Sequence, residues 1–210
     1  MSVYVIGITG ASGAPYARRV LQALLHGGHH VKLIVSPAGE RVLDIELGLR
    51  FSGARLARQQ QWAEALDVDG QGLELLAHRD FAASIASGSY PFEAMAVVPC
   101  SMGTLSRIAT GASTNLIERA ADVTLKECRR LILVPRETPL NRIHLKNMLE
   151  LADAGAEILP AMPGFYHHPA SVDDLVDMMA GRVLDRLGVD NDLFKRWQGD
   201  PLAHIAHLDN

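Results

Sequence analysis

Small and polar residues gather in a turn near the start of the chain, where they could bind an anion. Residues 7–13 read Gly-Ile-Thr-Gly-Ala-Ser-Gly and follow an apolar run that begins at Val3. A strand, a glycine-rich turn and a helix in this order present backbone N–H groups and a helix dipole to a negative ligand. Ser12 adds a hydroxyl group. A tight turn without a ligand is the alternative, because glycines at this spacing are only modestly specific.

Three later segments have the same character, and each comes at the end of an apolar run. They are Ser36 after residues 30–35, Ser101-Met102-Gly103-Thr104 after residues 94–100, and Arg136-Glu137 after residues 131–134. Open parallel sheets bind ligands at the carboxyl ends of their strands. The four segments therefore predict one site, whose amides, hydroxyls and guanidinium group suit a phosphate.

Apolar runs alternate with segments of helical spacing along most of the chain. We expect strands at residues 3–8, 30–36, 73–77, 94–100, 131–134 and 156–159, and helices at 14–25, 38–47, 61–66, 115–127, 143–154 and 171–187, with another helix after residue 104. This alternation predicts an α/β fold of three layers, Rossmann- or flavodoxin-like, with a mainly parallel sheet and helices on both faces. Residues 80–92 are expected to form a loop. We expect one domain over residues 1–210, with a polar tail from about residue 198.

The composition limits the classes of partner. The 210 residues carry a net charge of −4 without a cluster of Lys and Arg, so we expect no nucleic-acid partner. The longest uncharged run, residues 1–17, contains three glycines and a proline and lacks a basic start, which argues against a membrane span or a signal peptide. Cys100 and Cys128 do not make a disulfide framework. These features indicate a cytoplasmic protein with reduced thiols and no membrane partner.

One interpretation of the glycine turn is a nicotinamide dinucleotide site. Gly7, Gly10 and Gly13 match the G-x-x-G-x-x-G spacing of the short-chain dehydrogenases. However, no tyrosine is followed four residues later by a lysine, so the proton-transfer pair of that family is missing. The second expected strand ends in Ser36, where a ribose hydroxyl would need an acidic residue. The dehydrogenase is therefore the less favoured alternative.

The same turns lie within longer motifs that resemble those of the UbiX-type flavin prenyltransferases. In family order the matching segments are residues 9–13, 99–105, 115–123, 125–127, 134–140 and 163–167, and the resemblance extends from about Val3 to Trp197. It implies a flavodoxin-like fold that binds reduced FMN and dimethylallyl phosphate, joins the prenyl group to N5 and C6 of the flavin, and releases prenylated FMN. It also implies a homododecamer and a partner decarboxylase of the UbiD type that receives the product.

The resemblance assigns two sets of binding residues. The FMN set is Gly10, Ala11, Ser12, Ser36, Ser101, Met102, Gly103, Thr104 and Arg136. The set for the prenyl donor is Arg119, Lys126, Tyr166 and Arg182. Cations around an allylic phosphate stabilise the charge that grows on it as the C–O bond breaks, so no metal ion is expected.

The catalytic residues implied by the resemblance are Ser12, Glu46, Lys126, Glu137 and Trp197. Ser12 and Glu46 would relay a proton, and the ring of Trp197 would stabilise a cation-like allylic group. Each assignment has an alternative: Glu46 as a solvated helix carboxylate, Trp197 as a surface or interface residue, and Glu137 as the ion-pair partner of a neighbouring arginine. Tyr90 has weaker support as a residue that lines the site.

The remaining reactive residue types have simpler interpretations. The histidine pairs 29–30, 167–168 and 204/207 lack the acidic or thiol partners of a metal site, and Cys100 is expected to pack rather than react. Two other functions remain open: an FMN-dependent cysteine decarboxylase and a flavin-storage module. The segment Pro135-Arg136-Glu137 differs from the Pro-x-Met-Asn pattern of those decarboxylases.

Overall fold

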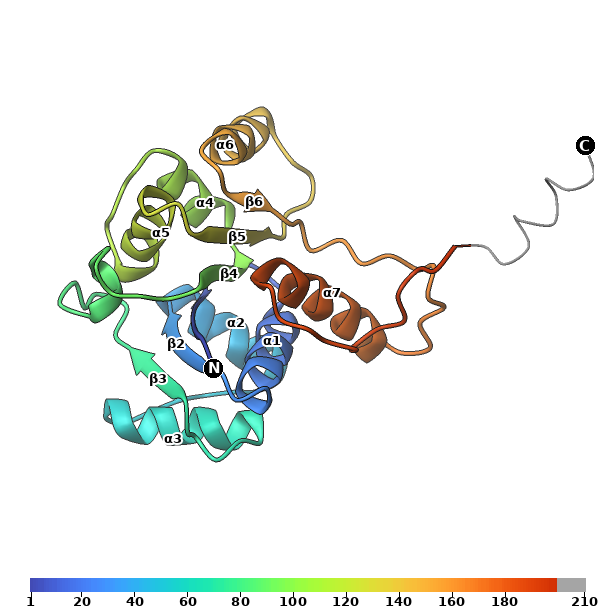
Figure 1. Cartoon of the computed structure of the whole chain (residues 1–210), viewed down its shortest axis with the longest axis horizontal. Helices are drawn as coiled ribbons and strands as arrows, with labels where there is room; N and C mark the ends of the chain where they lie inside the picture. The colour runs from blue at the N-terminus through green and yellow to red at the C-terminus, as the bar shows by residue number, and fades with distance from the viewer. Residues whose placement is uncertain (200–210) are drawn as a thin grey trace, which may run out of the picture.

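The sheet and its connections follow the expected α/β pattern. The computed structural model describes residues 1–199, and Figure 1 shows the sheet with its helices. The strands are β1 (Val3–Ile8), β2 (His30–Val35), β3 (Leu73–Leu76), β4 (Ala94–Cys100), β5 (Arg130–Pro135) and β6 (Glu157–Ile158). The helices are α1 (Ala14–His26), α2 (Pro37–Leu47), α3 (Arg55–Leu66), α4 (Met102–Ala109), α5 (Leu116–Lys126), α6 (Arg142–Asp153) and α7 (Val172–Leu187), with a 3-10 turn η1 at Ser84–Ala86.

The strands lie in the order β3-β2-β1-β4-β5-β6, and every neighbouring pair is parallel. The chain moves outward from β1 to β3, returns to the centre at β4, and then moves outward to β6. The order in which the chain adds strands to the sheet therefore reverses between β1 and β4. Open parallel sheets bind their ligands at such a reversal point. The predicted parallel sheet of a Rossmann- or flavodoxin-like fold is confirmed.

The central strands are apolar along their length because both of their faces are covered. All seven residues of β4 are buried, as are five of the six residues of β1. Strands with two covered faces form nearly continuous apolar runs instead of alternating patterns. This is why these strands are recognisable in the sequence.

Two layers of helices cover the sheet. Helices α1, α2, α3 and α7 pack on one face, in a core that includes Leu21, Trp62 and Leu184. Helices α4 and α5 pack on the other face, through residues such as Leu105 and Ile117. Helix α6 lies beside β6 at the edge of the sheet (Figure 1). The expectation of helices on both faces is therefore confirmed.

Helix α3 differs most from the sequence expectation. It begins at Arg55 and not at Gln61, and its buried residues Trp62, Ala63 and Leu66 all lie in its second half. A helix that starts with polar residues and packs only at its end shows no apolar periodicity over its first turns. Two smaller differences are the shortness of β6 and the 3-10 turn within the expected loop at residues 80–92.

Serine residues cap the N-termini of α2 and α4, the two helices that follow their strands most directly. The hydroxyls of Ser36 and Ser101 each accept a hydrogen bond from the backbone N–H three residues later, at 3.0 and 3.3 Å. A serine at this position satisfies one of the unpaired amides of the first turn. Helices α2 and α4 therefore start at the carboxyl edge of the sheet. Helix α7 follows Ser171, which forms a reciprocal capping box with Asp174.

Candidate functional site

The turns after four consecutive strands lie side by side at the carboxyl edge of the sheet. Strands β2, β1, β4 and β5 are neighbours, so the segments that follow them are brought together. The N–H of Ser36 donates to the carbonyl of Ile8 at 2.9 Å. Arg136 Nε donates to the carbonyl of Ser12 at 3.4 Å, which links the turn after β5 to the turn after β1. The four polar turns thus meet at one edge, as the sequence indicated.

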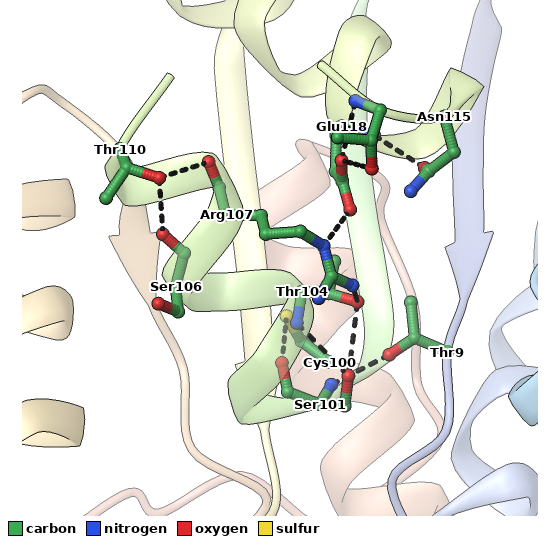
Figure 2. Close-up of polar contacts among 10 residues, drawn as sticks. Thr9, Cys100, Ser101, Thr104, Ser106, Arg107, Thr110, Asn115 and Glu118 are labelled. Atoms are coloured by element: carbon green, nitrogen blue, oxygen red, sulfur yellow. Dashed lines mark hydrogen bonds and ion pairs between the residues drawn. The ribbon is translucent and has the colours of Figure 1, made fainter. Parts of the chain in front are cut away.

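Thr9 joins the turn after β1 to the turn after β4. Its side chain is almost completely buried, and its hydroxyl donates to the carbonyl of Pro99 at 2.8 Å. The same hydroxyl accepts from the N–H of Ser101 at 2.7 Å (Figure 2). A hydroxyl that uses its donor and its acceptor in this way fixes the two turns relative to each other. Thr9 was not predicted as a site residue, although it lies within the glycine turn and within the family-like segment 9–13.

The start of α4 presents open backbone donors at this edge. The hydroxyl of Ser101 donates to the hydroxyl of Thr104 at 3.1 Å and accepts from its N–H. The N–H groups of Met102 and Gly103 belong to the first helical turn and have no acceptor within the helix. Amides in this position bind phosphates and carboxylates. The four residues expected from the resemblance therefore have the arrangement of an anion site.

An ion pair between a half-exposed arginine and a buried carboxylate lies beside this helix start. Arg107 Nε donates to Glu118, whose side chain is completely buried, and Arg107 Nη2 lies 3.4 Å from the hydroxyl of Thr104 (Figure 2). The other carboxylate oxygen of Glu118 accepts from the N–H and hydroxyl of Thr114 at 2.9 and 2.7 Å. Burial raises the pKa of Glu118, but the hydrogen bonds from Arg107 and Thr114 outweigh burial and leave the pKa below its ordinary value.

Thr9, Ser101, Thr104, Arg107 and Glu118 together form what we call the edge cluster. Arg107 and Glu118 were not predicted as site residues. They come from α4 and α5, and only the packing of these two helices brings their side chains together. In the sequence, Glu118 lies within the family-like segment 115–123 and Arg107 follows the capping serine, Ser101, by six positions, but neither residue was assigned a role.

The start of α1 is already bonded to a carboxylate. Glu46, near the end of α2, accepts from the N–H groups of Gly13 at 3.0 Å and Ala14 at 2.8 Å. Glu46 is therefore tied to the glycine turn and is not a solvated helix carboxylate. Burial raises the pKa of the nearby Tyr16, and the charge of Glu46 raises it further, while Arg136 opposes this effect. The amides at the start of α1, which were considered for a phosphate, therefore donate to Glu46 instead.

Tyr166, Arg182 and Trp197 gather on the outer side of α7. The segments before and after α7 lie together there (Figure 1), and the rings of Tyr166 and Trp197 meet edge to face with centroids 6.0 Å apart. Arg182 lies 3.6 Å from the carboxylate of Asp185, to which Arg196 also donates at 2.7 Å. We call these five residues the outer cluster. Its two rings line a cavity of about 360 Å³.

The outer cluster is separate from the edge cluster in a single chain. Within residues 1–199, no hydrogen bond or ion pair joins a member of one cluster to a member of the other. Trp197 is 65 % exposed and Tyr166 is 42 % exposed, so both aromatic rings present open surface.

Lys126 lies at the opposite edge of the sheet from the four turns. It ends α5 shortly before β5 begins and pairs with the carboxylate of the next residue. On the same helix, Arg119 pairs with Asp122 and donates to the carbonyl of Ala86 at 3.1 Å. Arg136, by contrast, follows the carboxyl end of β5. A strand of this length spans roughly 17–20 Å, so one chain does not bring Lys126 to the turns.

Three further residues singled out in the sequence have simple environments. The carboxylate of Glu137 accepts from the N–H of the next residue at 3.1 Å, and within residues 1–199 it forms no salt bridge. Tyr90 lies at the amino edge, with Lys32 Nζ 4.8 Å from its ring centroid. Cys100 is fully buried, and burial raises the pKa of its thiol to about 12. A thiol in this state packs in the core, as expected, and does not supply a thiolate.

Two of the seven described histidines pack against other rings. His29 meets Tyr4 edge to face at 5.2 Å, and His167 meets Tyr166 at 5.7 Å. Among residues 1–199, His, Cys, Asp and Glu side chains form no group of three that could hold a metal ion. The same residues contain no helix with the length and apolar character needed to span a membrane. His204, His207 and most of the expected polar tail lie outside the described residues.

Comparison with known proteins agrees with these features. The flavoprotein family model matches residues 2–184. Over 197 residues the chain is 50 % identical to a Halalkalibacterium halodurans protein named flavin prenyltransferase UbiX, with 93 % of each chain covered. It resembles the structure of AnUbiX (PadA1) in complex with FMN and dimethylallyl pyrophosphate, with a TM-score of 0.85, 40 % identity, and 95 % of this chain and 98 % of that chain covered.

A second similar structure is a dodecameric FMN-dependent UbiX-like decarboxylase from Escherichia coli O157:H7. Its TM-score is 0.83 and its identity 40 %, with 94 % of this chain and 100 % of that chain covered. Matches of this identity and coverage extend over both helical layers and the whole sheet. The chain therefore belongs to the flavoprotein family and, within it, to the UbiX flavin prenyltransferases.

Proposed function

We propose that this protein transfers a dimethylallyl group from dimethylallyl phosphate to N5 and C6 of reduced FMN. The observation that carries the proposal is the carboxyl edge of the sheet, where α2 and α4 begin and Arg136 bonds to the turn after β1. It occurs in a chain that is 40 % identical to a protein crystallised with FMN and dimethylallyl pyrophosphate. The diphosphate in that complex makes it the second donor to test.

The carboxyl edge offers the groups that an FMN phosphate requires. Hydroxyls at the starts of α2 and α4 and the open amides of Met102 and Gly103 suit a dianion. Glu46 already occupies the amides of α1, so we assign the phosphate to the starts of α2 and α4. Residues 10–12 and Arg136 would then hold the rest of the flavin. When bound, reduced FMN supplies the nucleophilic N5 and C6 atoms.

The prenyl donor needs residues that a single chain keeps apart. Tyr166 and Arg182 belong to the outer cluster, Lys126 lies at the amino edge, and Arg136 lies at the carboxyl edge. A site that uses all four residues draws on more than one copy of the chain. We therefore infer a homo-oligomer, and the dodecameric relative from Escherichia coli makes a dodecamer the first state to test.

Helix α6 has surface for such contacts between copies. Ile143, Leu145 and Leu149 are 68 %, 52 % and 62 % exposed on this helix. Three large apolar side chains on one helix exceed the scattered single residues that a monomer usually leaves exposed. Burial of this surface against another copy would stabilise the assembly.

The cations act on the leaving group in this mechanism. As the C–O bond of the donor breaks, negative charge grows on the phosphate oxygen, and Lys126, Arg136 and Arg182 stabilise it by charge-assisted hydrogen bonds. Arg119 supports the same phosphate. The exposed ring of Trp197 offers a π face to the cation-like allylic carbon.

Carboxylates and a hydroxyl are our candidates for the proton steps. Glu46 accepts from the N–H of the residue that follows Ser12, so we assign to its carboxylate a proton exchange with the Ser12 hydroxyl after local rearrangement. Glu137 follows Arg136 and is the alternative acceptor for the proton lost on ring closure. The product, prenylated FMN, would pass to a decarboxylase of the UbiD type. We place these events in the cytoplasm, where Cys100 and Cys128 remain reduced.

The direct test is the mass of the flavin after anaerobic incubation with reduced FMN and dimethylallyl phosphate. The proposal expects the flavin mass to rise by one prenyl group less a hydrogen, and Lys126→Ala or Arg182→Ala to reduce this change. Unchanged flavin with the phosphate and with the diphosphate donor would contradict the proposal.

An FMN-dependent decarboxylase is the second candidate, because the Escherichia coli relative carries that name. Release of carbon dioxide from a cysteinyl peptide, together with unchanged flavin, would favour it. The cypemycin decarboxylase shares only 17 % identity with this chain at a TM-score of 0.54, so that similarity concerns the fold alone.

A further inference from the structure

Arg107 lies where it can contribute to the anion site at the start of α4. Its side chain points back toward the helix start, as long helical side chains do, and its Nη2 lies 3.4 Å from the hydroxyl of Thr104. Its Nη1 would lie 3.5 Å from a Cβ atom added at Gly103. The guanidinium group therefore lies beside the first turn of α4, next to Gly103 and Thr104, and Figure 2 shows it beside Thr104.

Glu118 holds the guanidinium group in this place. The carboxylate accepts from Arg107 Nε and is itself fixed by two hydrogen bonds from Thr114, while Asn115 accepts from the Glu118 N–H at 3.1 Å. Glu118 is completely buried, whereas the side chain of Arg107 is 46 % exposed. The guanidinium group is thus anchored through Nε and Nη2, whereas its Nη1 forms no hydrogen bond within residues 1–199 and is left for a ligand.

We propose that Arg107 donates hydrogen bonds to the phosphate of the bound flavin and that Glu118 is its positioning residue. This inference rests on the proposed function and adds a guanidinium group to the residues assigned to FMN. A phosphate that accepts from helix amides and hydroxyls still has free oxygen lone pairs, and a planar guanidinium can bind two of them. The phosphate is the one charged group that FMN has and riboflavin lacks. Arg107 should therefore select FMN over riboflavin.

The test compares the affinities of oxidised FMN and riboflavin, measured by quenching of flavin fluorescence. The main variant, Arg107→Gln with Glu118→Gln, removes both charges, so the net charge of the protein is unchanged and no buried carboxylate is left unpaired. The matched control, Arg186→Gln with Glu157→Gln, removes an ion pair between α7 and β6. Thermal melting establishes that each variant is folded.

We expect the main variant to lose at least about tenfold in affinity for FMN, which is the usual loss when a hydrogen bond to a charged group is removed. Its affinity for riboflavin should stay within twofold of wild type. The control should bind both flavins as wild type does. If the main variant lost affinity for both flavins to the same extent, or bound FMN as wild type does, the inference would be overturned while the flavin site itself would stand. A wild-type protein that binds neither flavin would overturn the proposed function as well.

Arg107→Lys provides the test if the main variant does not fold. Lysine keeps a positive charge next to Glu118, but its single ammonium group cannot pair with Glu118 and also present a fork to the ligand. We expect a several-fold loss of FMN affinity without a change for riboflavin. An unchanged preference for FMN in this folded variant would again overturn the inference.

Discussion

The edge cluster and the outer cluster use similar side chains in opposite ways. In the edge cluster, a carboxylate, a guanidinium and three hydroxyls satisfy one another within one chain, and Glu118 is completely buried. In the outer cluster, two arginines share Asp185 at the surface, and Tyr166 and Trp197 are both exposed, Trp197 for most of its surface. The first cluster is complete in one chain, whereas the second leaves its aromatic faces open.

This difference separates stability from catalysis. Donors that are fixed before a ligand arrives need no rearrangement to bind it, but their removal leaves buried partners unsatisfied. Exposed groups cost little to remove, because water replaces their contacts. Substitutions in the edge cluster should therefore lower stability, and substitutions in the outer cluster should lower prenyl transfer without unfolding the protein.

The largest difference in stability is expected between substitutions of Arg107 in the edge cluster and Arg182 in the outer cluster. Arg107→Ala leaves the carboxylate of Glu118 buried without its cation, and we expect unfolding to become easier by about 2–3 kcal/mol. This is less than for a fully buried pair, because the half-exposed Arg107 leaves space that water can enter. Arg182→Ala should cost less than about 1 kcal/mol, since Asp185 keeps Arg196. Urea unfolding of both variants measures the difference, and equal losses would remove the distinction between the clusters.

Thr9 provides the next test, because valine has nearly the same shape without the hydroxyl. Thr9→Val removes a buried hydrogen bond to Pro99 and the acceptor of a partly buried hydrogen bond from the Ser101 N–H. We expect a loss of about 1–2 kcal/mol in urea unfolding. The control is Thr110→Val, where an exposed hydroxyl donates to carbonyls of its own helix. If Thr110→Val lost as much stability as Thr9→Val, the burial of the Thr9 hydroxyl would not explain its contribution.

The sequence predicted the edge of the sheet better than the contacts behind it. Buried parallel strands are continuous apolar runs, so the ends of β1, β4 and β5 and the polar turns after them were visible. Thr9 and the pair Arg107–Glu118 were not, because their roles depend on how turns and helices pack across the sheet. The polar first half of α3 was missed for a related reason, since it buries no apolar side chain.

The donor residues show a second limit of the sequence. Lys126, Arg182 and Trp197 were identified through motifs of the family, which say what a residue contacts but not which copy of the chain supplies it. A single chain places Lys126 at one edge of the sheet and Arg136 at the other. Spacing along one sequence carries no information about contacts between copies.

Acid should weaken the edge cluster in a way that depends on Glu118. Its pKa is lowered in the folded protein, so the unfolded chain takes up a proton at a higher pH than the folded chain does. The stabilisation by this carboxylate is therefore complete at neutral pH and is lost as the pH falls below about 5. The free energy of unfolding, measured with urea at pH 7 and at pH 4, should differ less between the two pH values for Glu118→Gln than for wild type. Identical differences in the two proteins would exclude Glu118 as a source of the acid sensitivity.

The smallest effect on stability is expected at Trp197, together with a large effect on activity. Trp197 is 65 % exposed and meets Tyr166 only edge to face, so Trp197→Ala should change the stability by less than about 0.5 kcal/mol. Loss of an aromatic face from a cation-like group is worth up to about 2 kcal/mol when the site is desolvated, so flavin prenylation should slow about tenfold or more.

Phe165→Ala is the matched control, because Phe165 lies in the same segment and is 68 % exposed. Mass spectrometry of the flavin measures the rates. If the Phe165 variant slowed as much as the Trp197 variant, the effect would belong to the packing of the segment and not to an aromatic group at the reacting carbon.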